Sequence, residues 1–174
     1  MNNTHSLADA LKLTKNTVPE ETYYHTLMSL KIANNLSRLA GLTEEDKYLL
    51  MKAVALHAIN KNKRQAFDYL RIKGWDEEVC LLVLHSWEVL DLTKLPEDLH
   101  VIHRILIISS ICSSQQGWLQ TIPRGLNNIL KTCKTQYDKD YARIVADSAR
   151  VWLDDFSRGK ELIVANASSS KHPN

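Results

Sequence analysis

The scarcity of Gly and Pro is the feature that most constrains this chain. Only five Gly and four Pro occur among its 174 residues, so long stretches contain no residue that breaks a helix. Within these stretches apolar residues recur three and four positions apart, as in 23–39, which is the period of one face of an α-helix. We therefore expect an all-α fold, a single irregular bundle of about six to eight helices.

Capping residues divide the chain into separate predicted helices. Thr43 precedes an apolar periodic segment as an N-cap does, Asp76 and Asp138 are expected to cap two further helices, and Gly41 ends the first long one. The predicted helices cover approximately 19–40, 43–57, 62–73, 77–90, 96–112, 123–133 and the segment from 138 onward. The predicted domain organisation is a partly helical N-terminal segment (1–18), a helical domain (19–157) and a flexible polar C-terminal tail (158–174).

Charge and hydropathy exclude two classes of partner. The 22 basic and 20 acidic residues give a net charge of +2, far less basic than an electrostatic nucleic-acid binder. The longest strongly apolar stretch, 105–112, is too short to cross a bilayer, and the N-terminus lacks the apolar region of a signal peptide. We expect a cytoplasmic protein that contacts neither nucleic acid nor membrane. Its three separated cysteines are expected to be free thiols.

Two of the seven histidines stand in an informative context. His25 and His57 are 32 residues apart, and each is expected inside a helix. The string GLTEE at 41–45 supplies the turn between these helices, and LHAINK at 56–61 ends the second one. Two antiparallel helices joined by a tight turn bring a residue near the start of one beside a residue near the end of the next. His25 and His57 are therefore expected to approach each other in the core.

This pattern resembles the opening of the HD phosphohydrolase superfamily, and specifically its HD-GYP subgroup. In that pattern a histidine begins a helix, an LGLSEE-like turn follows, and the next helix ends in LHDIGK, which LHAINK matches at four of six positions. The resemblance covers roughly 20–155 and is weak after residue 62. It implies an HD-like fold for 19–157, in which His25 and His57 correspond to histidines that help to bind divalent metals.

Both acidic ligands of the family's minimal metal site are absent. Ala58 replaces the Asp of the HD pair. The segment 101–111 resembles the late family helix ARILAIADV, and there Ser110 replaces the last Asp ligand. A bridging carboxylate supplies charge that two neutral imidazoles cannot. The resemblance therefore implies no catalytic residue, no cofactor and no bound metal, and a divalent ion at the two histidines is disfavoured.

The segment 84–96 admits two registers against the family. In one, Glu88 and Asp91 agree with the HHExxDGxGYP motif, although its histidines and glycines are missing. In the other, His85 takes the place of an earlier family histidine, and LPEDL at 95–99 resembles the HDOD relatives, which generally lack catalytic metal. Both registers stay open. The candidate ligand-binding residues are His25, His57, Lys61, His85, Glu88, Asp91 and Arg104.

Three functions follow from these patterns. The first is a non-catalytic regulatory domain that binds a protein partner or a nucleotide-like ligand. The second is an active metal-dependent phosphohydrolase or phosphodiesterase with altered ligands, drawn from His85, Glu88, Asp91 and His103. The third is a histidine phosphotransfer protein, because HTLMSLK at 25–31 resembles the HTLKGS helix of such modules.

The expected partners follow from the first of these functions. The HD-GYP resemblance implies bacterial signalling, with a signalling protein as partner and a cyclic dinucleotide or another phosphate-bearing molecule as ligand. A homodimer is a further expectation, because the apolar segments 79–84 and 105–108 could lie between two protomers.

Overall fold

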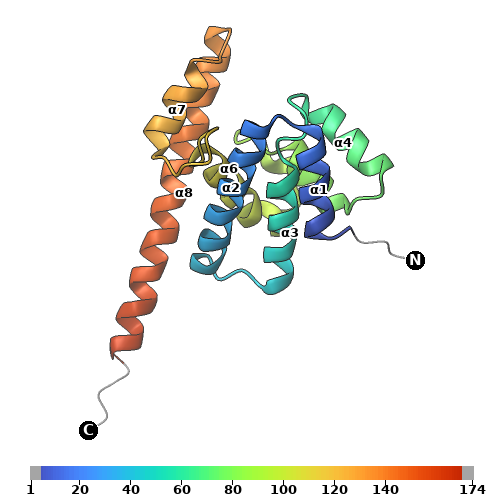
Figure 1. Cartoon of the computed structure of the whole chain (residues 1–174). Coiled ribbons are helices and arrows are strands. Elements are labelled where there is room, and N and C mark those ends of the chain that lie inside the picture. The colour runs from blue at the N-terminus through green and yellow to red at the C-terminus, as the bar shows by residue number, and fades with distance from the viewer. Residues whose placement is uncertain (1–4, 170–174) are drawn as a thin grey trace.

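The structure, a computed structural model, describes the backbone of residues 5–169 and the side chains of residues 5–158 (Figure 1). The described part of the chain is an all-α bundle of eight α-helices with two short 3-10 helices, which confirms the predicted fold class. The elements are α1 (Leu7–Thr17), α2 (Glu20–Leu39), α3 (Glu44–Leu56), α4 (Lys63–Ile72), α5 (Glu77–Leu84), η1 (Leu92–Lys94), η2 (Glu97–Leu99), α6 (His100–Ile111), α7 (Ile122–Leu130) and α8 (Gln136–Ser169).

Helix α6 forms the centre of the bundle. Its apolar side chains are buried on several sides by α2, α3 and α8. Figure 1 shows α8 as a long rod along one side of the body, with α7 beside its first turns and its C-terminal part extending past the other helices. The long helix is thus a flank of the bundle, whereas α6 is its core.

The predicted cap at Thr43 is present, and Asn62 caps α4, whereas Asp138 lies inside α8 and its N–H donates to the Thr135 hydroxyl. The Thr43 and Asn62 side chains accept hydrogen bonds from the backbone N–H groups of Asp46 and Gln65, three residues into α3 and α4. Gly41 adopts a φ of +67°, a left-handed conformation that suits the turn between α2 and α3. Local sequence therefore sets the lengths of the two helices that carry the histidines.

The N-terminal segment packs into the bundle. Helix α1 lies against α3, Ala10 is fully buried, and the buried Thr14 hydroxyl donates to the carbonyl oxygen of Ala55 at 2.6 Å. At the other end of the chain, α8 continues to Ser169, and residues 170–174 lie outside the described residues. The flexible tail expected from residue 158 stays a prediction.

The prediction that Asp76 caps α5 with its side chain is wrong, because its carboxylate makes no hydrogen bond to the start of that helix. Its carboxylate instead pairs with Lys52 of α3, whose side chain is 6% exposed. The lysine also lies over the Tyr48 ring, 4.9 Å from its centroid. A buried ammonium needs a counter-ion, so the Asp76 carboxylate bonds to Lys52 and not to the backbone N–H groups at the start of α5.

Helix α5 ends at Leu84, about six residues before the predicted end near residue 90. Glu88 explains the early end, because its carboxylate accepts the backbone N–H groups of Leu90 (2.9 Å) and Asp91 (3.3 Å). A side chain that bonds nearby backbone in this way competes with helical hydrogen bonding. The chain from 85 to 99 therefore consists of turns and the two 3-10 helices.

The apolar segments offered as a protomer interface are internal. Val79, Cys80, Leu82 and Val83 are fully buried within the chain's own core, and 105–108 is 0–1% exposed. This removes the reason for placing a homodimer there. Cys80, Cys112 and Cys133 are free thiols, as expected. No helix in the described range has the length and apolarity needed to cross a membrane.

The Lys52–Asp76 pair generates a test of stability. Asp76→Asn should destabilise the fold by about 3–5 kcal/mol, because it leaves a buried ammonium without a counter-ion. The double variant Lys52→Met/Asp76→Asn should cost less than the two single changes added together. Urea unfolding followed by circular dichroism measures all three. Glu44→Gln, which breaks an exposed pair with Lys47, is the control and should cost no more than about 1 kcal/mol; an equal cost for Asp76→Asn would refute the assignment.

Candidate functional site

The predicted histidine pair lines a cavity of about 660 Å³. Five parts of the chain form it: the first half of α2, the end of α3 with the start of α4, the turn after α5, the end of α6 with the segment that follows it to residue 120, and α7 with the two residues after it. We call it the histidine cavity. Its lining residues are His25, His57, Lys63, Ser86, Trp87, Ser110, Ile111, Ser113, Ser114, Gln115, Gln116, Gln120, Arg124, Gly125, Asn128, Ile129, Lys131 and Thr132.

The two imidazoles meet as the sequence predicted. Nε2 of His25 lies 3.3 Å from Nε2 of His57, with the ring planes inclined at 48°. His25 lies in the second turn of α2, and His57 is the C-cap of α3. The antiparallel arrangement of these helices thus brings the start of one to the end of the other.

The hydrogen bonds around the pair fix the tautomer of His57. Nδ1 of His57 lies 2.6 Å from the carbonyl oxygen of Val54, which can only accept, so this nitrogen donates and Nε2 of His57 holds a lone pair. Nε2 of His25 faces that lone pair, and Nδ1 of His25 lies 3.1 Å from the Ser113 carbonyl oxygen and 2.9 Å from the Ser113 hydroxyl. The Ser113 and Ser29 hydroxyls lie 2.6 Å apart. These contacts join the two imidazoles and the two serines in one hydrogen-bonded network.

Burial keeps both imidazoles neutral. Desolvation, with the nearby His25 and Lys63, lowers the pKa of His57 to about 3, and desolvation also lowers the pKa of His25. Lys63 donates to the carbonyl oxygen of His57, and burial lowers the pKa of its ammonium to about 8. Near neutral pH the positive charge of the cavity therefore comes from Lys63, Arg124 and Lys131.

The donor set lacks the carboxylates with which HD domains complete their divalent metal site. Two nitrogens 3.3 Å apart could both reach one tetrahedral ion at about 2.0–2.1 Å. However, no group of three or more His, Cys, Asp or Glu side chains in the described part of the chain could hold a metal. Ser110, at the position where the resemblance would place a carboxylate, lines the cavity as a hydroxyl, whereas Ala58 is not in its lining. The cavity is therefore a site of hydroxyls, amides and cations.

Five of the seven candidate residues do not line the cavity, and Lys61 and Arg104 are two of them. Lys61 is exposed and does not line it; Lys63, two residues later, occupies the place proposed for Lys61, because it lies in the first turn of α4 beside His57. Arg104 lies with its guanidinium 5.6 Å from the centroid of a Trp152 ring, so α8 covers it. The prediction of a lysine beside His57 is therefore correct in charge, but the lysine is residue 63 and not residue 61.

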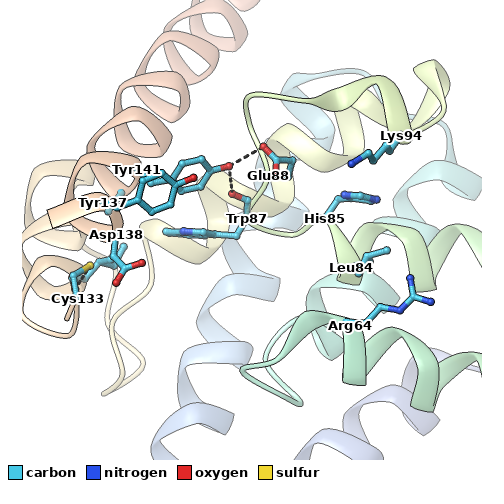
Figure 2. A pocket seen from close by; sticks show the side chains of 12 residues that line it. Arg64, Leu84, His85, Trp87, Glu88, Lys94, Cys133, Tyr137, Asp138 and Tyr141 are labelled. Carbon is cyan, nitrogen blue, oxygen red and sulfur yellow. Dashed lines mark hydrogen bonds between the residues drawn. The ribbon is translucent and has the colours of Figure 1, made fainter. Parts of the chain in front are cut away.

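A second pocket, of about 580 Å³, lies near the three remaining candidates, and we call it the aromatic pocket (Figure 2). His85 and Glu88 line it, whereas Asp91 does not, because its carboxylate accepts from Thr93 and pairs with Lys94. Trp87 and Ile129 line both pockets. The remaining lining residues are Arg64, Leu84, Lys94, Cys133, Tyr137, Asp138, Tyr141 and Ala142.

Several cavity residues were not found by sequence reasoning. Ser113 and Ser86 carry no motif, yet Ser113 bonds His25, and the Ser86 hydroxyl lies buried in the cavity wall with no hydrogen-bond partner. Arg124 and Lys131 lie in and directly after α7. One signal was available: no Asp or Glu occurs between residues 98 and 138, so the cations of this stretch have no acidic neighbours in sequence.

Comparisons with known proteins identify no relative. No family model matches the chain, and neither a curated protein nor a solved structure gives a significant match. The HD resemblance accordingly remains a prediction based on the motifs around His25 and His57.

The buried histidines predict how stability depends on pH. Besides His57, burial lowers the pKa of His103 to about 4; its Nε2 donates to the His85 carbonyl oxygen at 2.8 Å, and its Nδ1 has no partner. Below pH 6.5 the unfolded chain binds protons on these rings that the fold excludes, so stability falls as the pH decreases.

Each excluded proton contributes a slope of up to about 1.4 kcal/mol per pH unit. The urea midpoint of unfolding should therefore fall as the pH decreases from 7.5 to 4.5. His103→Gln should make this fall smaller, while the midpoint above pH 7 stays nearly unchanged. A stability that does not vary over this range would contradict the neutral state of the rings.

A glycine predicts how tightly α7 closes the cavity. A Cβ atom added to Gly125 would lie 2.2 Å from the carbonyl oxygen of Ile111, a backbone atom that cannot move aside as a side chain can. Gly125→Ala should therefore cost about 1–3 kcal/mol by overpacking, measured by urea unfolding. Asn127→Ala, exposed on the same helix, is the matched control and should be nearly neutral; similar costs for both would show that α7 does not rest on α6 in this way.

Proposed function

We propose that this chain is a non-catalytic regulatory domain that binds a phosphate-bearing ligand in the histidine cavity. The observation that supports this best is the sign of the lining charges. Lys63, Arg124 and Lys131 line the cavity, and no Asp or Glu is among its lining residues. A ligand with several negative oxygens would meet cations and hydrogen-bond donors on more than one wall.

The uncharged donors of the cavity support the same ligand class. The Ser86 hydroxyl is buried without a partner, at a cost that an acceptor on a ligand would remove. Side-chain amides of Gln115, Gln116 and Asn128 add donors to the lining. We expect a signalling protein to bind the domain when its cavity is occupied, in keeping with the family resemblance.

The two alternative functions receive less support. A metal-dependent hydrolase needs more ligands than the two histidines provide, and His85, Glu88 and His103 do not line their cavity. A phosphotransfer histidine needs an accessible ring nitrogen, whereas Nε2 of His25 faces His57. Ligand binding without chemistry uses all the features that the cavity has.

Binding of inorganic pyrophosphate tests the proposal. Calorimetry in the presence of a chelator should show pyrophosphate binding, and Arg124→Gln should weaken it by about tenfold or more, the value of one charge-assisted hydrogen bond. Lys134→Gln removes an exposed cation that does not line the cavity and should leave the affinity nearly unchanged. Equal effects of the two variants would mean that binding is non-specific.

The hydrolase alternative has its own measurement. The purified protein should contain no stoichiometric transition metal and should not hydrolyse bis(p-nitrophenyl) phosphate with added Mn²⁺. A bound metal and a hydrolysis rate that are both lost in His57→Ala would replace the proposal with the alternative.

A further inference from the structure

The aromatic pocket is lined by charges of both signs, whereas the charged residues that line the histidine cavity are all basic. Tyr137, Asp138 and Tyr141 of α8 form one side of it, and Arg64, His85 and Lys94 lie on the other (Figure 2). Unlike the histidine cavity, it is lined by carboxylates as well as cations. A ligand that fits both sides carries charges of both signs.

Glu88 is held as a fixed carboxylate at this pocket. Its Oε1 atom accepts from the Tyr141 hydroxyl at 2.8 Å and from the backbone N–H groups of Leu90 and Asp91. Desolvation favours the protonated acid, but these hydrogen bonds outweigh it and lower the pKa of Glu88. The three bonds all end on Oε1, so Oε2 is free to accept from a ligand.

The opposite side offers cations that are only weakly engaged. Arg64 pairs with Asp68 at 3.3 Å and Lys94 with Asp91 at 3.6 Å, and all four side chains are at least half exposed. Such exposed pairs are worth about 0–1 kcal/mol. A ligand carboxylate could therefore replace either partner acid at small cost.

Aromatic rings form the surface near Glu88. Tyr137 and Tyr141 are stacked with their centroids 6.3 Å apart, and the Tyr141 hydroxyl lies 3.3 Å from the Trp87 carbonyl oxygen. Figure 2 shows the Trp87 ring beside the two tyrosines. Flat rings of this kind bind an aromatic or large apolar group.

We propose that the aromatic pocket binds a free α-amino acid with an aromatic side chain, as its zwitterion. The ammonium group donates to Glu88, the carboxylate is bound by Lys94, and the side chain packs against Trp87 and the tyrosines. The pocket volume of about 580 Å³ lies within the range of small-molecule sites. This site is separate from the anion site proposed for the histidine cavity and does not depend on it.

Three related compounds separate the charges of the ligand. Phenylalanine has both charges, 3-phenylpropionate lacks the ammonium group, and 2-phenylethylamine lacks the carboxylate. Calorimetry on the full chain should show phenylalanine binding about tenfold or more tightly than either analogue, because each analogue leaves one charged side unpaired. Absence of phenylalanine binding, or equal binding of the three compounds, would overturn the proposal.

Two variants assign the charges to residues. Glu88→Gln keeps an acceptor for the Tyr141 hydroxyl but removes the charge, so phenylalanine should fall to the affinity of 3-phenylpropionate while that compound binds as before. Lys94→Gln should in the same way reduce the affinity for phenylalanine to that for 2-phenylethylamine, while 2-phenylethylamine binds as before. Glu97→Gln and Arg71→Gln, neither of which lines the pocket, are matched controls and should leave all three affinities unchanged.

The outcome is distinguishable from that of the anion site. A variant that loses phenylalanine binding should still bind pyrophosphate and should unfold at the urea concentration of the unmodified chain. If Glu88→Gln and Glu97→Gln affect phenylalanine binding equally, Glu88 is not its ammonium acceptor and the proposal fails.

Discussion

Helix α6 is buried along most of its length, and both candidate sites depend on where it places its polar residues. Ile102, Ile105, Leu106, Ile107, Ile108 and Ile111 form its apolar contacts, each 0–1% exposed. Burial of a side chain of this size contributes about 1.5–3 kcal/mol, so the position of the helix is strongly fixed. Ser110 and Ser113 at its C-terminal end reach the histidine cavity, and His103 near its start supports the backbone of His85.

The absence of carboxylates sets the electrostatics of the histidine cavity. With Ser110 as a hydroxyl and Ala58 outside the lining, nothing compensates protonated imidazoles, and burial keeps them neutral. The hydrogen bonds that run from Ser29 to Val54 satisfy them instead. The cations of the cavity then have no acidic partners within its lining, which makes an anion the best complement.

The two pockets share Trp87 and Ile129, although they suit different ligands. The histidine cavity has cations and neutral donors, whereas the aromatic pocket has both signs of charge around a group of rings. The shared wall exists because α5 ends early. The turn after Leu84 places Trp87 between the pockets, and Glu88 bonds Tyr141 of α8.

The sequence by itself determined the helical class, the cap at Thr43, and the meeting of His25 with His57. These depend on local propensity, on period and on the length of one tight turn, all of which can be read within a short stretch of chain. It did not determine the partners of Asp76, Glu88 or Lys63, or the roles of Ser113 and Arg124. Those were decided by the tertiary structure, because a buried charge or hydroxyl bonds to whichever group packing brings near it. Asp76 bonds to Lys52, 24 residues away in sequence, and Ser113 bonds to His25, 88 residues away.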